Sequence, residues 1–445
     1  VMPACQTPVQ GDMTVETSVF DSRPVILTEG ENREVPFRPG LRTAKISLEK
    51  PEPGDPRSDW DRLLDALKEE TGAETSEIRP DLPLASSLYE RRLQAPEWHV
   101  VFTEEEILDM QISEPNCHMA AFDIGTTTVA GFLLDGRSGN VCAIESRRNP
   151  QAQYGADVIA RASYALEHGA DSLRDCIRRA LDEMLGALAQ KAGISREEIY
   201  QVSIVGNTCM QHLLLGVSPA SLVHAPYTPA FSGRLTLRAS DLDLRIAPRG
   251  QALLLPSIAG YVGADTCGCL LALRQDQREE ITLMIDIGTN GEMVLGNREK
   301  LVTCSTAAGP AFEGAKIECG MCGAAGAVDH VFREDGILTY TTIHGKPARG
   351  LCGSGLIDLV AELRRAGLVD EMGHLESGQA REDVFVLAPP ALSGSDRGVY
   401  LTQKDIREVQ LAKAAIAAGI ALLREELGIG EEEIRTVYIA GAFGN

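Results

Sequence analysis

Two short stretches of the sequence combine an aspartate, glycine and hydroxyl side chains in nearly the same order. FDIGTTTVAG contains Asp123, and IDIGTNGEMV contains Asp286. Each stretch lies between apolar runs, which is typical of a β-hairpin with a tight glycine turn. Such a turn can direct backbone N–H groups and hydroxyls toward an anion, and the aspartate that ends the incoming strand can hold a hydrated Mg2+. We predict that two facing hairpins clamp the phosphates of one nucleotide.

A single hairpin of this kind is equally consistent with an ordinary tight turn. Two copies, each at the start of an α/β series, favour a shared site, and their separation is too long for a solenoid repeat. Asp123 and Asp286 are the predicted catalytic and Mg2+-binding residues. Glu292 is a third catalytic candidate that could orient water or metal, and a capping or strand-pairing role is equally consistent with its position. The predicted phosphate contacts are Gly125, Thr126, Thr127 and Thr128 in the first turn, and Gly288, Thr289, Asn290 and Gly291 in the second.

The last stretch of the sequence, YIAGAFGN, adds a third glycine turn. Gly441 and Gly444 follow a predicted buried strand and allow the backbone to approach a ligand closely. The sequence contains neither GxxxxGK followed by Ser or Thr nor a strand-linked GxGxxG, which argues against P-loop and Rossmann folds.

Composition restricts the class of protein. The 445 residues include 42 Lys and Arg against 64 Asp and Glu, a formal charge of −22. That balance argues against nucleic acid or an anionic membrane surface as partners, because both require clustered cations. No apolar run reaches the roughly 18 residues of a membrane helix, and nothing at Val1 resembles a signal peptide. The eleven cysteines are few for the length and odd in number, so we expect reduced thiols and a cytoplasmic protein.

The elements that must position the two turns follow an α/β pattern. From residue 117 to 445, strands and helices alternate and glycine is frequent. Ahead of them, residues 17–42 gather Pro and Gly and are predicted to form a linker. Residues 43–116 are predicted to form a small α+β middle domain, with a helix capped by Ser58 or Asp59. We find no catalytic constellation in this domain and interpret it as a spacer or docking module.

The order of two phosphate turns and one adenosine turn resembles the actin, sugar-kinase and Hsp70 ATPase superfamily. The resemblance implies an α/β, two-lobed actin-like (ribonuclease H-like) fold. Its first lobe is expected at about 117–262 and its second at about 263–434, with the chain returning to the first lobe at 435–445. In this superfamily the long helix that here carries Gln410 and Lys413 flanks the adenosine.

A closer resemblance rests on several longer motifs. DIGTTTVAG, NPQAQYGADVIAR, VGNTCMQHLLLG, PSIAGYVGADT, DIGTNGEMVLG, TAAGPAFEGA, GSGLID, TQKDIREVQLAKAAI and YIAGAFGN are together similar to the reductive activators of corrinoid proteins. The resemblance covers residues 117–445 and implies an ATP-dependent activase that returns the Co(II) corrinoid of a partner protein to Co(I). It also implies a homodimer, and nucleotide contacts from the glycine-rich motifs at Gly309, Gly353, Ser354 and Gly355.

The same family implies an electron donor and an N-terminal plant-type 2Fe–2S domain. The stretch ACQTPVQGDMTVE is similar to the one around the fourth cluster cysteine, so Cys5 matches that ligand and residues 1–16 are interpreted as a remnant of the domain. The CxxxxCxxC run that supplies the other three ligands is absent from the sequence. Cys319 and Cys322 offer half of a four-thiolate site, which a dimer could complete as in the activators of 2-hydroxyacyl-CoA dehydratases. Corrinoid activators tend to have Arg at the second position, which argues against that cluster.

Two further alternatives stay open. A small-molecule kinase shares the hairpins and would carry an acid or Asn cluster for its substrate, and an actin-like scaffold would form nucleotide-dependent filaments. The stretch around Cys5 argues against both. His212, on an apolar helix face, is predicted to be a core residue rather than a metal ligand.

Overall fold

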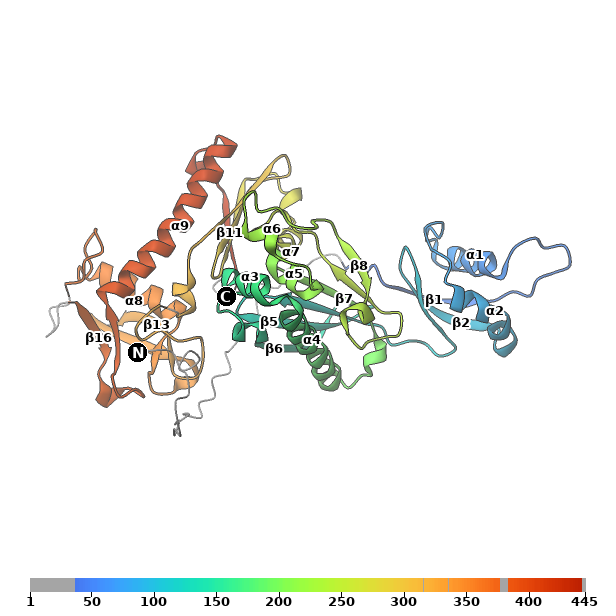
Figure 1. Cartoon of the computed structure of the whole chain (residues 1–445), viewed down its shortest axis with the longest axis horizontal. Coiled ribbons are helices and arrows are strands. Elements are labelled where there is room, and N and C mark those ends of the chain that lie inside the picture. The colour runs from blue at the N-terminus through green and yellow to red at the C-terminus, as the bar shows by residue number, and fades with distance from the viewer. Residues whose placement is uncertain (1–36, 315, 335, 377–382, 442–445) are drawn as a thin grey trace. The chain divides into compact units, whose positions relative to one another are not determined.

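The computed structural model describes residues 37–314, 316–334, 336–376 and 383–441 (Figure 1). These residues form two compact units. The larger unit contains the described residues up to Phe312 and those from Arg407 onward, and the smaller unit contains Glu313–Ile406. Cys5 and Gly444 lie outside the described residues.

The larger unit begins with a small α+β region. Strands β1 (Arg42–Ser47), β2 (Glu97–Phe102) and β3 (Ile107–Gln111) form an antiparallel sheet, and helices α1 (Asp59–Thr71) and α2 (Leu82–Gln94) pack beside it. Ser58 caps α1, as one of the two sequence alternatives predicted, because its hydroxyl accepts from the Asp61 N–H at 3.1 Å. The Asp61 carboxylate in turn accepts a hydrogen bond from the Ser58 N–H, which completes a capping box.

The centre of the larger unit is a six-stranded sheet in the order β6-β5-β4-β7-β9-β8. Its strands are β4 (His118–Ile124), β5 (Thr128–Asp135), β6 (Val141–Arg148), β7 (Ile199–Gly206), β8 (Leu235–Arg238) and β9 (Gln251–Leu254). Strands β4, β5 and β6 form an antiparallel meander, whereas β7 runs parallel to β4 and to β9.

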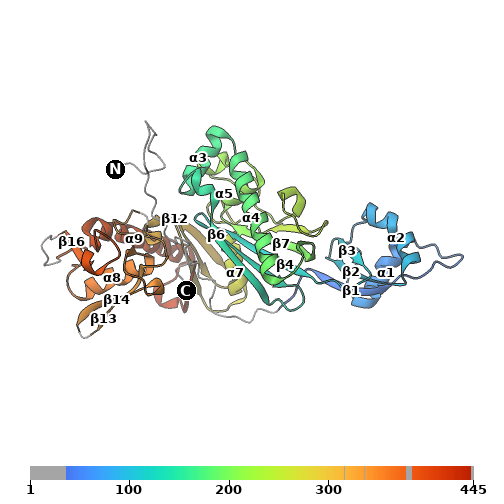
Figure 2. The ribbon, with the colours of Figure 1, turned by 90° about the horizontal axis from the view of Figure 1, so that it is seen from below.

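Helices cover both faces of this sheet. Figure 2 shows α3 (Val158–His168), α4 (Asp171–Ala192) and α5 (Thr208–Leu215) on one face, where Ile204 of β7 belongs to the main apolar core. The short helix α6 (Ala220–Val223) follows α5. The next residue of β7, Val205, points to the other face and meets α7 (Ala264–Leu273), since a Cβ added at Gly268 would lie 3.6 Å from the Val205 side chain.

A second sheet in the same unit repeats part of the first. Strands β10 (Thr282–Ile287), β11 (Gly291–Gly296) and β12 (Leu301–Thr306) form another antiparallel meander, and β18 (Thr436–Ala440) runs parallel to β10. The order β12-β11-β10-β18 matches β6-β5-β4-β7 in both sequence order and strand direction. The two aspartate-glycine stretches therefore lie at equivalent places in two related sheets.

The pairing of β18 corrects one expectation. Residues 435–445 were expected to return to the first lobe, but β18 joins the sheet of the second aspartate stretch, with Asp286 opposite Ala440. The expectation was wrong because an apolar strand followed by glycine fits a free parallel edge of either sheet. Helix α9 (Gln403–Leu427) packs on the same sheet, where a Cβ at Gly419 would lie 2.2 Å from the end of Met293.

The described residues of the smaller unit form two short sheets, one helix and the first turn of α9. Strands β13 (Ala327–Glu334), β14 (Ile337–Thr342) and β15 (Gly350–Leu351) form one sheet, and β16 (Val384–Ala388) and β17 (Val399–Thr402) form the other. Helix α8 (Gly353–Arg365) packs on β13. Among the described residues of the whole chain, no helix is both long and apolar enough to cross a membrane.

Candidate functional site

The first predicted turn is the connection between β4 and β5. Asp123 is the second-last residue of β4, and its partner across the hairpin is Ala130. Gly125 must be glycine here, because an added Cβ would lie 2.7 Å from the Thr128 carbonyl oxygen. The Asp123 side chain is open to solvent, although protein surrounds it closely enough to disfavour its charge.

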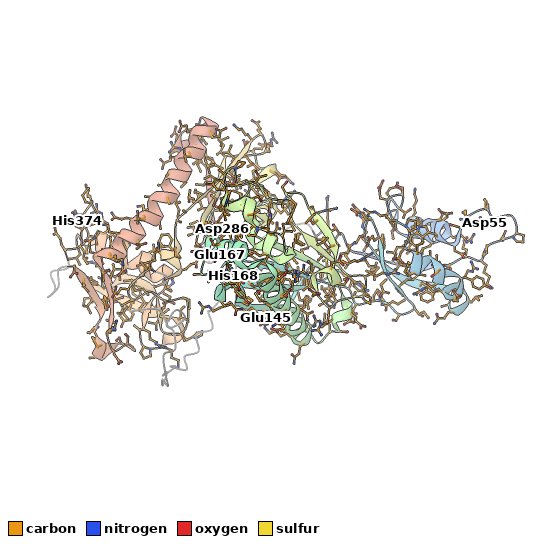
Figure 3. The ribbon with its side chains drawn as sticks, viewed as in Figure 1. Asp55, Glu145, Glu167, His168, Asp286 and His374 are labelled. Carbon is orange, nitrogen blue, oxygen red and sulfur yellow. The ribbon has the colours of Figure 1, made fainter. Side chains whose placement is uncertain are left out.

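The second predicted turn connects β10 and β11. Asp286, labelled in Figure 3, lies near the end of β10 directly opposite Glu292 of β11, so two carboxylates share one face of the hairpin. The Gly288 N–H donates to the Asn290 carbonyl at 2.9 Å, and the Gly309 N–H donates to the Thr289 carbonyl at 3.0 Å. Gly309, predicted only from its motif, therefore contacts this turn.

The third predicted glycine turn also reaches the second aspartate. Gly441 follows β18 and has a left-handed backbone with φ of 80°. A Cβ at this position would lie 2.5 Å from Asp286 Oδ1. No larger residue fits here without a shift of the carboxylate or the backbone.

Sequence reasoning missed a fourth acid at this place. Asp265 is the second residue of α7, and the chain before it is held close because a Cβ at Gly263 would lie 2.5 Å from the Asn207 Cα. The charge of Asp265 acts on Asp123, Asp286 and Glu292. The two turns therefore share one cluster of acids, with Asp265 common to both.

Burial raises the pKa of every acid in this cluster, and the charges of neighbouring acids add to the shift at Asp123, Asp286 and Glu292. Burial, followed by the charges of Asp265 and Asp286, raises the pKa of Asp123 to about 7. Burial and then Asp265 raise the pKa of Asp286 to about 6. Burial and the charges of Asp265 and Asp286 raise the pKa of Glu292 to about 8, against a hydrogen bond of 3.2 Å from the Ser305 hydroxyl. The pKa of Asp265 is raised mainly by burial.

The acid cluster fits a hydrated Mg2+. Among the described residues, no Lys, Arg or His contributes to the pKa shifts of the four carboxylates. In the same part of the chain, no group of three or more His, Cys, Asp or Glu side chains is arranged to hold a metal ion. Mg2+ usually keeps several waters and uses one or two carboxylates together with phosphates, and this arrangement allows that.

The other predicted contacts lie on α9 and at the start of α8. Gln410 accepts a hydrogen bond from Arg407 at 2.6 Å, and Lys413 is exposed on α9. Gly353, Ser354 and Gly355 begin α8 in the smaller unit, where the Ser354 hydroxyl donates to the Asp329 carbonyl. Their role in nucleotide binding stays a prediction.

The predicted core histidine is a core residue. His212 is fully buried, its Nδ1 lies 2.7 Å from the Thr208 carbonyl, and its Nε2 accepts from the Ala230 N–H at 3.0 Å. This pattern places the proton on Nδ1 and leaves the ring neutral. Burial also lowers the pKa of His212, so it supplies no charge to the site.

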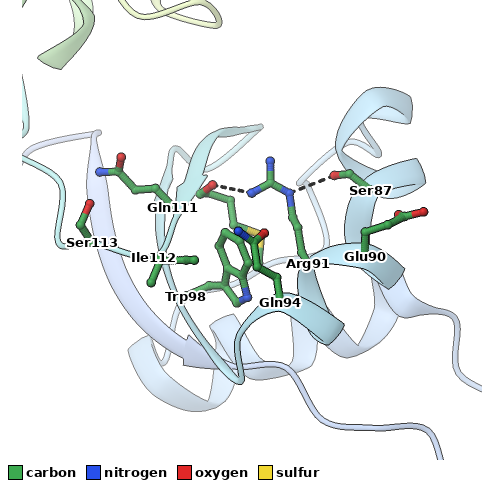
Figure 4. A pocket seen from close by; sticks show the side chains of 9 residues that line it. Ser87, Glu90, Arg91, Gln94, Trp98, Gln111, Ile112 and Ser113 are labelled. Carbon is green, nitrogen blue, oxygen red and sulfur yellow. Dashed lines mark hydrogen bonds between the residues drawn. The ribbon is translucent and has the colours of Figure 1, made fainter.

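A separate depression of about 660 Å3 lies in the small α+β region (Figure 4). It is lined by α2 and the end of β3, with the Arg91 guanidinium 5.0 Å from the centre of the Trp98 ring. Arg91 donates to the Ser87 hydroxyl and to the Met110 carbonyl. None of the lining residues belongs to either turn, so this depression is not part of the acid cluster.

Family models match most of the sequence. The RACo linker region matches residues 30–112, the RACo middle region matches 119–278, and the C-terminal domain of RACo, the ASKHA domain, matches 280–445. The corrinoid activation enzyme RamQ of Eubacterium limosum is 36% identical, over 99% of this chain and 77% of that protein. The chain belongs to the RACo family.

Two more similarities agree with RACo membership. The solved structure of a reductive activator for a corrinoid, iron-sulfur protein superposes with a TM-score of 0.81 and 34% identity, over 95% of this chain and 69% of that one. The reductase of the Co(II) methylated amine-specific corrinoid protein of Methanosarcina barkeri is 26% identical, over 73% of this chain and 62% of that protein. The predicted family and the predicted actin-like α/β fold are confirmed.

Proposed function

We propose that this RACo protein uses ATP to return the Co(II) corrinoid of a partner protein to Co(I). One observation supports this most: in a RACo chain, two matching aspartate-glycine turns and Asp265 form one acid cluster within a single compact unit. The reaction adds one electron to Co(II), and hydrolysis of ATP to ADP and phosphate accompanies it. A low-potential donor supplies the electron.

The residues of the two turns bind and orient the nucleotide. The backbone N–H groups of Thr126, Thr127, Thr289 and Asn290, together with the threonine hydroxyls and the Asn290 side-chain amide, contact phosphate oxygens, as such turns do in anion sites. Asp123 and Asp286 hold the waters of Mg2+, which supplies positive charge against the phosphate oxygens when bound. Before Mg2+ binds, the pKa of Glu292 is raised to about 8, so this side chain holds its proton at neutral pH and adds little repulsion to Asp286.

ATP has to act through a change of conformation. A nucleotide cannot shift a reduction potential by its presence alone, so its bound and hydrolysed forms must favour states that contact the corrinoid protein differently. Order and disorder of loops around a terminal phosphate provide such a switch in other ATPases and GTPases. The two turns are the natural place for it here.

The remaining parts of the proposal concern electron delivery and assembly. We propose that a 2Fe–2S domain delivers the electron, with Cys5 as one ligand, and that the protein is a cytoplasmic homodimer. A protein in which a CxxxxCxxC segment precedes Val1 should show the 2Fe–2S absorbance and lose it in a Cys5→Ser variant. Light scattering would give the oligomeric state.

The test combines the protein with a Co(II) corrinoid protein and a low-potential reductant. We expect Co(I) absorbance to appear only with Mg2+ and ATP, and ATP hydrolysis to rise when the corrinoid protein is added. Transfer of the terminal phosphate to a small metabolite, without any Co(I), would contradict the proposal and support the kinase alternative.

A further inference from the structure

A fully buried arginine stands directly behind the first turn. Arg161 is on α3, and its side chain has no exposed surface. Its guanidinium donates to two carbonyls, Thr126 at 2.6 Å and Gly155 at 3.0 Å, and to the Met210 sulfur at 3.3 Å. No carboxylate of the described residues forms an ion pair with Arg161; Asp157 acts on it only at a distance and caps the same helix.

A buried cation without an anion is costly and needs an explanation. A protein normally pairs such a charge or replaces it with an apolar group. Burial lowers the pKa of Arg161 to about 10, which leaves the group charged at neutral pH. The only anionic ligand expected near the first turn is the triphosphate of the nucleotide, one peptide group away from the guanidinium.

Asn149 holds the neighbouring peptide group in the same way. This residue is also buried, and its Nδ2 donates to the Gly125 carbonyl at 2.8 Å. Its backbone N–H donates to the Thr127 carbonyl at 2.8 Å. Three successive carbonyls of the turn, at Gly125, Thr126 and Thr127, are therefore held from behind.

The held carbonyls fix the direction of the turn's N–H groups. These peptide bonds are trans, so each carbonyl and the N–H of the next residue point in opposite directions. The N–H groups of Thr126 and Thr127 are consequently directed away from Asn149 and Arg161. Asn207 adds a hydrogen bond of 3.1 Å to the Thr126 hydroxyl, which fixes that side chain as well.

We propose that Arg161 is a positioning residue of the nucleotide site, which fixes the Thr126 peptide for phosphate binding and supplies a buried positive charge opposite the triphosphate. Asn149 shares the positioning role but carries no charge. The inference rests on the proposed function, because it assumes that the first turn binds ATP. It adds Arg161 to the nucleotide site as a residue that contacts neither the phosphates nor Mg2+.

The test measures nucleotide affinity in the full chain with Arg161→Met, Arg161→Lys and Asn149→Ser. A control is Arg178→Lys, because Arg178 also donates to two carbonyls, of Leu214 and Asp241, in the same region. We expect Arg161→Met to weaken ATP binding by ~10- to 100-fold, the loss for a charged hydrogen bond, and Arg161→Lys to weaken it less. Adenosine affinity and the melting temperature of Arg161→Lys should stay close to wild type.

Comparing the affinity losses for ATP, ADP and adenosine distinguishes a positioning role of Arg161 from a general loss of folded structure. If Arg161 acts on the phosphates, the loss falls in the order ATP, ADP, adenosine, because each phosphate removed takes negative charge away from the site. Arg178→Lys should stay within about twofold of wild type for all three. The double variant Arg161→Met with Asn149→Ser should lose less than the product of the two single losses, because both act on one turn.

Different results would overturn the role of Arg161 and the proposed function. Equal loss for ATP and adenosine in Arg161→Lys, or unchanged ATP affinity in a folded Arg161→Met, would overturn the inference. If Arg161→Met does not fold, Arg161→Lys and Asn149→Ser decide by the same criterion. A wild-type protein that does not bind ATP would instead overturn the proposed function.

Discussion

The two aspartate-glycine turns have similar sequences and similar places in their sheets, but they are supported differently. Side chains from other elements hold the first turn: Asn149, Arg161 and Asn207 donate to its backbone or to its hydroxyl. In the second turn, the Gly309 N–H donates to the Thr289 carbonyl at 3.0 Å, and the Thr306 hydroxyl of β12 donates to the Gly291 carbonyl at 3.2 Å.

This difference in support suggests that the two turns have different roles in nucleotide binding. The first turn is fixed before the nucleotide arrives, because buried polar side chains hold its peptide groups in place. The supports described for the second turn come from the adjacent strand β12 and the residues just after it, and Asp286 there lies opposite Glu292 and against Gly441. We expect the first turn to anchor the phosphates and the second to respond to hydrolysis.

The largest expected effect comes from removing either aspartate charge. Asp123→Asn and Asp286→Asn should each lower ATP turnover by at least ~100-fold, because each removes a carboxylate that holds the waters of Mg2+. Steady-state ATPase rates with the corrinoid protein present measure the effect. Normal rates in both variants would remove the assignment, and a normal rate in one alone would show that the turns do not share one nucleotide.

The next effect concerns the close contact between Gly441 and Asp286. Gly441→Ala should displace the Asp286 carboxylate and lower ATP turnover about tenfold, in addition to about 1 kcal/mol of backbone strain. Gly428→Ala is the matched control, because Gly428 has a similar φ of 69° but no atom within 4 Å of an added Cβ. Both variants should lose similar stability, and only Gly441→Ala should lose turnover.

A third prediction uses the raised pKa of Glu292. Its folded pKa of about 8 lies above the ordinary 4.5, so the folded state binds more protons than the unfolded state between those values. The unfolding free energy therefore falls as pH rises through this window, by at most about 1.4 kcal/mol per pH unit for one proton. Glu292→Gln should flatten this decline and be more stable than wild type at pH 8 without Mg2+. Parallel stability curves for the two proteins would contradict the shift.

The smallest effect should come from the hydroxyl that supports the second turn. Thr306→Val removes one hydrogen bond, to the Gly291 carbonyl, and should cost about 1 kcal/mol of unfolding free energy with little change in ATP affinity. Chemical denaturation and nucleotide titration measure the two quantities. A large loss of ATP affinity would show that the second turn is fixed in advance as firmly as the first, which would remove the contrast between them.

The sequence predicted the parts of the site that follow a local rule. Each of the two stretches combines a strand, an aspartate and a glycine turn within about ten residues, so Asp123, Asp286 and the turn glycines could be identified from the sequence. His212 was also correctly assigned to the core. Asp265 and Arg161 escaped notice because their roles depend on contacts between distant elements. Asp265 looks like an ordinary acid in the first turn of a helix, and Arg161 looks like one polar residue of an amphipathic helix.

Strand pairing was the other limit of sequence reasoning. The apolar pattern of β18 shows that the strand is there but does not say whether β4 or β10 is its neighbour, since both offer a parallel edge to a strand of this kind. The sequence identified Gly441 as a residue whose flexible backbone could approach a ligand closely. That Gly441 lies against Asp286 could be seen only in the structure.

The central claim is that both turns hold one triphosphate. A structure determined with Mg2+ and a slowly hydrolysed ATP analogue tests it most directly. We predict one analogue per chain, with its phosphates contacted by Thr126 or Thr127 from one turn and by Thr289 or Asn290 from the other, and with Mg2+ waters on Asp123 and Asp286. A triphosphate bound by one turn alone, or at another place in the chain, would contradict the account.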